Sequence, residues 1–284
     1  MPVLTVEECQ RLVPKLNNRA GAALIRLGLH LAAIDQVNDL YDRNCRHQGA
    51  DFADAILRDI GVDYGIGNPE RLAHLPEGPF ITVSNHPYGH LDGIMLIDLF
   101  GHLRPDYKVM VNQLLAHIRA MSPNFIEVIP KGNEDTGPKA ASLAGVRATL
   151  GRLRDGHPMG FFPSGAVSDL SLKEHAIRDR IWPESVMRLI QKAGVPVIPV
   201  RFFDRSSMFF YRLGMIDWKV RLVRLCHEVF NKRGKQVRLG IGQTISVEAQ
   251  RACRTLEEFT RLLRGSVYDM PLPDKFVNRS EFSC

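Results

Sequence analysis

The chain has 284 residues, of which 45% are hydrophobic and 24% are charged, so it is not a disordered protein and can bury a sizeable core. Its formal net charge of +6 predicts attraction to an anionic partner, which could be a lipid surface, a nucleic acid or an acidic protein. The five cysteines include no CxxC pair, which excludes an obvious disulfide framework or zinc site. The N-terminus shows no signal-peptide pattern, so we expect the protein in the reducing cytoplasm. We also expect the chain to form one domain.

Residues 1–61 are expected to form an N-terminal helical part. Residues 20–34 are apolar or small except for Arg26 and His30, and the segment is too short to span a membrane. Four apolar residues fall on one helical face, namely Leu24, Leu27, Leu31 and Ile34. Such a stripe either packs in the core or lies at a membrane interface, and we favour the core. A further helix is predicted with Asp51 as its cap, inward residues Phe52, Ile56 and Ile60, and an end at Gly61.

Residues 62–200 alternate between strand and helix patterns, which indicates an α/β catalytic core. The predicted strands are 62–66, 81–84, 107–111, 125–129, 159–162 and 195–200. One predicted helix begins near Asp92, and three more cover 113–120, 139–154 and 184–193. The last of these is expected to stop at Gly194. The two prolines of the strand 195–200 favour an edge or irregular position for it.

Residues 201–284 form a basic C-terminal part. A helix is predicted over 218–230, a strand over 236–241, and a second helix after a capping box that begins at Thr255. Residues 201–240 contain ten lysines or arginines against three acids, which favours a solvated basic face.

The predicted strand 81–84 leads into a loop that carries His86, His90 and Asp92. An imidazole can remove a proton from a hydroxyl while a carboxylate on its other ring nitrogen fixes the tautomer. No serine or cysteine nucleophile is evident beside them. A purely structural role, with His86 ending the strand and Asp92 capping the helix, is the simplest alternative.

Besides general-base catalysis, these residues alone leave two other functions open. His86, His90 and Asp92 could bind the metal of a hydrolase, although Pro87 and Gly89 make a regular helix between the two histidines unfavourable. A non-enzymatic lipid-binding protein is the third possibility. No nucleic-acid motif accompanies the basic residues, so we expect no nucleic-acid partner.

The run Asn85-His86-Pro87-Tyr88-Gly89-His90-Leu91-Asp92-Gly93 resembles the first block of the lysophospholipid acyltransferase (glycerolipid acyltransferase) superfamily. The spacing from His to Asp is one residue longer than the commonest pattern and resembles the hemolysin-like, lyso-ornithine lipid O-acyltransferase branch. Three later segments resemble the second, third and fourth blocks, namely 125–131, Phe161-Phe162-Pro163-Ser164-Gly165 and 195–200. The third block departs from the family, because Ser164 stands where relatives have Glu and Ala166 where the hemolysin-like branch often has Glu.

This resemblance implies a glycerol-3-phosphate acyltransferase-like α/β fold, with a mixed, largely parallel central sheet flanked by helices and an N-terminal helical segment. It implies His86 as general base, Asp92 as its orienting carboxylate, and four substrate-binding residues, Asn85, Lys131, Ser164 and Gly165. Backbone amides of the turns 86–93 or 164–166 would stabilise the oxyanion.

The implied reaction transfers a fatty acyl group from acyl-ACP or acyl-CoA to the free hydroxyl of a lysolipid and needs no cofactor or metal. The acceptor would be lyso-ornithine lipid, a related lyso-aminolipid or lysophosphatidic acid. We expect peripheral contact with the inner face of the cytoplasmic membrane, where anionic lipids attract basic proteins.

Overall fold

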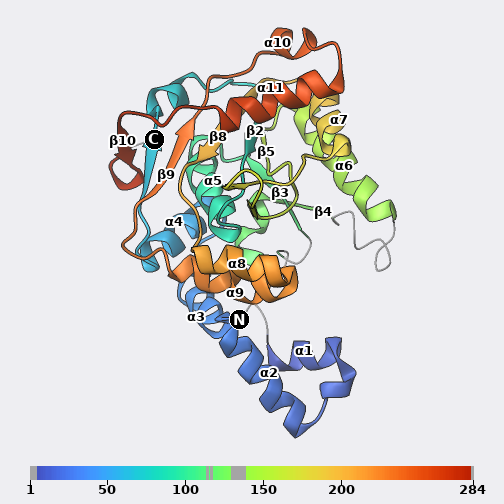
Figure 1. Ribbon diagram of the computed structural model, residues 1–284, viewed down its shortest axis with the longest axis vertical. Helices are drawn as coiled ribbons and strands as arrows, with labels where there is room; N and C mark the ends of the chain where they lie inside the picture. Colours follow the sequence, from blue (N-terminus) through green and yellow to red (C-terminus); the bar gives the residue numbers. More distant parts are fainter. Residues whose placement is uncertain (1–4, 113–114, 116–117, 129–138, 283–284) are drawn as a thin grey trace.

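The computed structural model describes residues 5–112, 115, 118–128 and 139–282. Among these residues, eight strands form one mixed sheet with helices on both of its faces (Figure 1). The strands are β1 (Tyr64–Gly67), β2 (Ile81–Ser84), β3 (Lys108–Asn112), β4 (Phe125–Val128), β5 (Met159–Phe161), β8 (Val197–Phe202), β9 (Val237–Ile241) and β10 (Phe276–Asn278). Their spatial order is β10-β1-β9-β8-β2-β5-β3-β4, with only β10–β1 and β9–β8 antiparallel. The expected α/β class with a largely parallel sheet is therefore confirmed.

Two hydrophobic clusters lie on the two faces of this sheet. Helices α4 (Gly49–Asp59) and α5 (His90–Leu103) supply the first cluster, and α6 (Lys139–Arg154), α7 (Glu184–Ala193) and α11 (Leu256–Tyr268) supply the second. The other helices are α1 (Val6–Leu12), α2 (Arg19–Leu31), α3 (Ile34–Asn44), α8 (Met208–Ile216), α9 (Trp218–Phe230) and α10 (Val247–Arg251). Because β9 and β10 pair with β1, residues 62–200 and the C-terminal part share one sheet.

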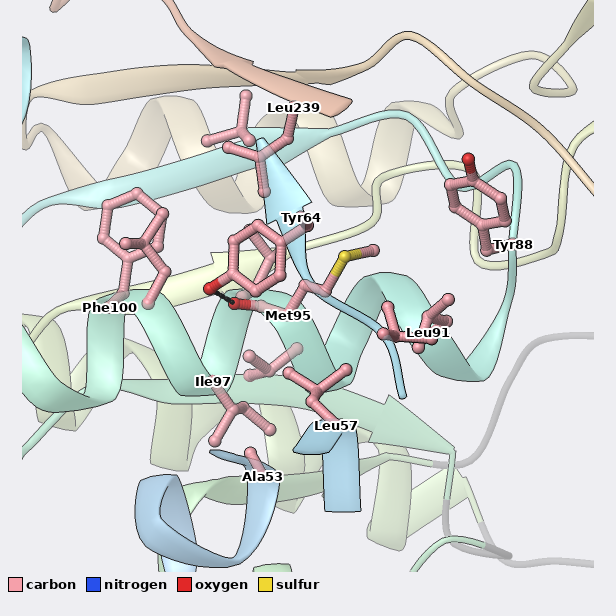
Figure 2. Packing of buried hydrophobic residues seen from close by; sticks show 14 of the residues in the cluster. Ala53, Leu57, Tyr64, Tyr88, Leu91, Met95, Ile97, Phe100 and Leu239 are labelled. Carbon is pink, nitrogen blue, oxygen red and sulfur yellow. Dashed lines mark hydrogen bonds between the residues drawn. The ribbon is translucent and has the colours of Figure 1, made fainter. Parts of the chain in front are cut away.

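Helix α5 runs through the middle of the first cluster and is held there along most of its length. Met95 and Phe100 are fully buried, and Ile97 of the same helix faces Ala53 of α4 (Figure 2). The inward residues predicted for α4 are buried, namely Phe52, Ile56 and Ile60. The cap prediction was wrong by position, because Gln48 occupies the N-cap and Asp51 lies in the first turn. This packing fixes α5, whose first turn carries His90 and Asp92.

Of the edge or irregular position predicted for strand β8, the structure shows the irregular one. The strand lies inside the sheet, parallel to β2 and antiparallel to β9. Pro199 is tolerated because β9 ends at Ile241, opposite Val200, and the next pairing is the single bridge from Val197 to Ile245. The missing N–H of Pro199 therefore falls beside a gap in the ladder, where no strand hydrogen bond is lost.

The apolar stripe of the N-terminal segment also corrects the sequence interpretation. Helix α2 ends at Leu31 and the chain bends by 74° into α3. Leu24, Leu27 and Leu31 are more than half exposed, so this stripe faces outward instead of packing in the core. Within the described ranges, no single helix is long and apolar enough to cross a bilayer, although α2 and α3 taken together have the required length and composition.

The basic residues after position 200 do not form one solvated face. Arg221 and Lys232 are buried, and Lys232 donates a hydrogen bond to the carbonyl oxygen of Arg205. Arg238 pairs with Asp204, and Arg201 donates to the carbonyls of residues 268 and 270. The prediction of a solvated face was therefore wrong for these four residues, which hold the fold together.

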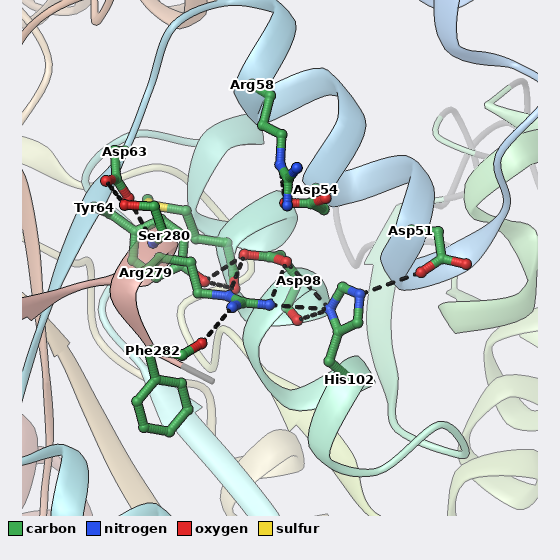
Figure 3. A network of polar contacts seen from close by, with 11 residues as sticks. Asp51, Asp54, Arg58, Asp63, Tyr64, Asp98, His102, Arg279, Ser280 and Phe282 are labelled. Carbon is green, nitrogen blue, oxygen red and sulfur yellow. Dashed lines mark hydrogen bonds and ion pairs between the residues drawn. The ribbon is translucent and has the colours of Figure 1, made fainter. Parts of the chain in front are cut away.

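A buried ion pair fastens the C-terminal segment to α5. Arg279, just after β10, contacts the carboxylate of Asp98, which also accepts a hydrogen bond from the Tyr64 hydroxyl at 2.6 Å (Figure 3). His102, one turn further along α5, lies 3.2 Å from Asp98 and 3.2 Å from Asp51 of α4. The contacts of Asp98 lower the pKa of its carboxyl despite burial, and the hydrogen bond with Asp98 raises the pKa of His102 to about 9.

Candidate active site

The candidate site is the loop between β2 and α5. Asn85, the first residue after the strand, donates its side-chain amide to the carbonyl of Phe202 at 2.9 Å and accepts from the Phe202 amide at 2.8 Å. This pair of hydrogen bonds fixes the start of the loop to β8. The amide of Asn85, predicted to bind substrate, is thus engaged with the backbone of the neighbouring strand.

His86 and Asp92 meet at the start of α5. Nδ1 of His86 lies 2.9 Å from Oδ2 of Asp92, and the carboxylate is completely buried while the imidazole is 17% exposed. A neutral imidazole that donates its Nδ1–H to a carboxylate has its lone pair on Nε2. The structure thus brings together an imidazole and a buried carboxylate, the arrangement that a general base with an orienting acid requires.

Asp92 also caps the helix that carries it. The same Oδ2 accepts hydrogen bonds from the backbone amides of Tyr88 at 2.9 Å and Gly89 at 3.0 Å. Burial is the main influence on its carboxyl and raises its pKa, while His86 and the two amides favour the charged form. The contacts that cap α5 therefore also fix the carboxylate that faces His86.

Glycine is required at position 89 for two reasons. Its φ of +76° and ψ of −110° lie outside the regions that residues with a Cβ normally adopt. A Cβ there would also lie 2.8 Å from Leu225 of α9 and 3.0 Å from Val167. Leu225 and Val167 therefore pack directly against the bend of the loop at Gly89.

A third carboxylate, which the sequence motifs do not single out, holds the backbone of His86. Oδ1 of the buried Asp179 accepts from the His86 amide at 3.1 Å and from the Ser168 hydroxyl at 2.6 Å. Its Oδ2 accepts from the indole of Trp182 at 3.3 Å. Asp179 follows the short strand β7 (Ala176–Arg178), which pairs with β6 (Asp169–Ser171), and no local pattern connects it with a residue 93 positions earlier.

The segment that resembles the third family block lies directly against His86. The ring of Phe162 stacks on the imidazole with the ring centroids 4.0 Å apart, and Ser168 donates its amide to the carbonyl of His86. The hydroxyl of Ser164 donates to the carbonyl of Ala166 at 2.8 Å. Gly165 is exposed with a φ of +65° and open space where a Cβ would be. Lys131, the predicted head-group contact, lies outside the described residues.

The contacts of Ser164, Ser168 and His90 bear on whether the site could hold a serine nucleophile or a metal ion. Ser164 and Ser168 point their hydroxyls to Ala166 and Asp179, so neither forms a nucleophile pair with His86. His90 begins α5, and burial together with the neighbouring charge of His86 lowers its pKa to about 4. Within the described residues, no three His, Cys, Asp or Glu side chains are grouped so that they could hold a metal ion, so the alternative of a metal site at His86, His90 and Asp92 gains no geometric support.

Two further residues from α8 and α9 hold the loops that frame the pair. The hydroxyl of Tyr211 donates to the carbonyl of Pro87 at 2.6 Å. The buried guanidinium of Arg221 donates to the carbonyl of Ser168 and pairs with Asp169. The sequence suggests neither contact, because α8 has no clear periodicity and Arg221 looks like one member of a basic run.

Comparisons with known proteins identify the family of the chain. The family model described as acyltransferase matches residues 13–272. Lyso-glycine lipid O-acyltransferase from Bacteroides thetaiotaomicron is 26% identical over 83% of this chain and 85% of its own length. The protein with that name from Phocaeicola vulgatus is 26% identical over 85% of each chain.

Among solved structures, the 1-acyl-sn-glycerophosphate acyltransferase PlsC from Thermotoga maritima aligns with a TM-score of 0.47 and 15% identity, over 86% of this chain and 93% of its own. The family match covers the loop with His86 and Asp92, the segment that stacks on it and the strand that Asn85 contacts. The chain therefore belongs to this acyltransferase family.

Proposed function

We propose that the protein transfers a fatty acyl group from a thioester donor, acyl-ACP or acyl-CoA, to the free hydroxyl of a lyso-aminolipid. The observation that carries the proposal is the His86–Asp92 contact of 2.9 Å at the strand-to-helix loop of an acyltransferase. The names of the two relatives favour lyso-glycine lipid or a related lyso-aminolipid over lysophosphatidic acid as the acceptor. Lyso-ornithine lipid belongs to the same chemical class and is the second acceptor to test.

The reaction uses His86 as a general base. Nε2 takes the proton of the acceptor hydroxyl as its oxygen attacks the thioester carbonyl, and Asp92 stabilises the imidazolium that forms. The new C–O ester bond replaces the C–S bond, and the departing thiolate takes the proton back from His86. No covalent acyl-enzyme is needed, which suits a site whose nearby serine hydroxyls are already engaged.

We assign the stabilisation of the oxyanion to the amides of the first turn of α5. The amides of His86, Tyr88, Gly89 and Gly165 already donate to other groups in the structure. The first amides of a helix have no partner inside the helix, and the positive end of the helix dipole favours negative charge there. His90 and Leu91 supply such amides beside the reacting pair.

The acceptor is a lipid, so we also propose peripheral contact with the inner face of the cytoplasmic membrane. The outward leucines of α2 and the net charge of +6 support this contact.

A direct assay tests the proposal. Purified protein is mixed with radiolabelled acyl-ACP or acyl-CoA and with lyso-glycine lipid, lyso-ornithine lipid or lysophosphatidic acid. We expect labelled diacylated aminolipid together with one free thiol per acyl group transferred. Hydrolysis of the thioester without acylated lipid would indicate a hydrolase, and tight lipid binding without turnover would indicate a binding protein; either result contradicts the proposal.

A further inference from the structure

The α8–α9 hairpin carries a group of exposed apolar side chains beside the site. These residues, called the apolar ridge below, are Phe209, Met215, Ile216, Trp218, Val220, Leu222 and Val223. Their exposed fractions run from 45% to 80%. Met215, Ile216 and Trp218 lie within two residues of Asp217, where α8 meets α9. Single exposed apolar residues are common on protein surfaces, whereas seven on two neighbouring helices indicate a surface that binds a partner.

The surroundings of the ridge suit an anionic lipid surface. Arg205 and Arg212 are exposed on or next to α8, and the guanidinium of Arg224 lies over the ring of Phe209 at 5.6 Å. Interfacial segments combine such apolar groups with cations at the level of the head groups. Helix α2, whose leucines are exposed, lies below the hairpin in Figure 1, on the side of the molecule away from α10 and α11. Nε2 of His227 in α9 lies 2.9 Å from the carbonyl of Leu31, which ties the two elements together.

The hairpin is fastened to both loops that frame the reacting pair. From α8, Tyr211 holds the carbonyl of Pro87, the residue after His86. From α9, Arg221 holds Ser168 and Asp169, and Leu225 lies where a Cβ on Gly89 would collide. The position of the ridge therefore sets the position of the catalytic loop.

We propose that the apolar ridge inserts among the head groups of an anionic bilayer and holds the His86 loop at the lipid surface, a role that rests on the proposed function. The charge of Asp217 at the tip keeps the ridge at the head-group level, because burying a carboxylate among acyl chains is costly. An acidic carrier protein is the competing occupant of the same surface.

Tryptophan fluorescence reports this insertion directly. The chain has only two tryptophans, and Trp182 is buried while Trp218 is 53% exposed on the ridge. Adding vesicles of phosphatidylglycerol mixed with phosphatidylcholine should shift the emission to shorter wavelength, and brominated lipids should quench it. The Trp218→Phe variant should lose both changes. If vesicles bind the protein but leave the emission unchanged, or if only acyl carrier protein changes it, the proposal is overturned.

A matched pair of variants tests the ridge without touching the site. Ile216→Ser should weaken vesicle binding by about tenfold, in line with the loss of one large apolar side chain at the interface. Leu272→Ser, which changes a side chain that is 54% exposed elsewhere, should leave vesicle binding unchanged. Equal vesicle affinities for the two variants would overturn the proposal.

Activity on two forms of the acceptor separates this proposal from the proposed function. With a short-chain lysolipid dissolved as monomers, Ile216→Ser should turn over as fast as the wild type, whereas on vesicles its rate should fall with its binding. If the wild type acylates neither form, the proposed function fails, and the fluorescence result still decides whether the ridge inserts.

Discussion

Asp92 uses one carboxylate oxygen for the His86 ring and for two backbone amides, so its charge and its position are coupled. Asp92→Asn keeps an oxygen that can accept hydrogen bonds but removes the charge that stabilises the imidazolium and selects the tautomer. We expect acyl transfer to fall roughly 100-fold or more, with the acceptor KM little changed. Steady-state kinetics measure this split. A normal kcat in a folded Asp92→Asn protein would reduce Asp92 to a helix cap.

Asp179 is a positioning residue, since it holds the backbone of His86 and not the reacting ring. Asp179→Ala removes the acceptor for three donors, and we expect kcat to fall about tenfold or more, because small displacements of a reacting group are costly. Asp179→Asn retains an oxygen for the His86 amide and should restore most of the rate. If both variants lose only thermal stability while kcat per folded molecule is unchanged, Asp179 has no part in positioning His86.

The contact between His86 and Asp92 could be predicted from sequence because both residues lie within one loop. Asp179 could not, because it reaches His86 only after β6 and β7 have folded back over the loop. Ser164 is the opposite case, a residue that a motif singles out but whose hydroxyl is bonded within its own loop. Its place in a motif suggests a ligand contact, yet its hydroxyl is bonded to a carbonyl two residues away.

At the scale of elements, the bend between β2 and α5 depends on Gly89. Gly89→Ala places a methyl group against Leu225 and Val167 in a backbone conformation that alanine avoids, and we expect a loss of about 3 kcal/mol or more in the free energy of unfolding. Gly234→Ala is the matched control, because Gly234 has a φ of +67° but open space around it, and should lose only about 1 kcal/mol. Chemical denaturation measures both. Equal losses would mean that the contact with α9 does not matter.

Local patterns predicted the elements whose partners are close in sequence or whose periodicity is strong. Strand β2 and helix α7 were predicted with the bounds that the structure has, and Gly194 ends α7 as expected. For β8 the sequence left an edge and an irregular position open, because only the tertiary pairing shows that β9 ends opposite Val200. The outward stripe of α2 has the same periodicity as a buried one, so sequence alone could not choose between core and surface.

At the scale of the whole molecule, the network around Asp98 links α4, α5, β1 and the C-terminal segment (Figure 3). His102 faces Asp98, Asp51 and Arg279, and its pKa is raised from 6.5 to about 9 in the folded protein. A group whose pKa is higher in the folded protein contributes its full stabilisation when the pH is below its pKa in the unfolded chain. This stabilisation is lost as the pH rises through the pKa of the folded protein. We therefore expect the free energy of unfolding to fall by about 1–3 kcal/mol between pH 6.5 and pH 9.

Urea denaturation across this pH range measures the effect, with His102→Gln as the comparison. Glutamine does not titrate, so the variant should show a flatter dependence over the same interval. The same slope in both proteins would contradict the assigned role of His102.

The central claim is that His86 is the base of an acyl transfer, and the rate of the purified His86→Ala protein tests it most directly. With an acyl thioester and the preferred lysolipid, His86→Ala should lose roughly 100- to 10,000-fold in kcat while its melting temperature stays close to that of the wild type. His90→Ala, in which the neighbouring histidine is removed, should retain most of the rate. A folded His86→Ala protein that transfers acyl groups at the wild-type rate would contradict the account.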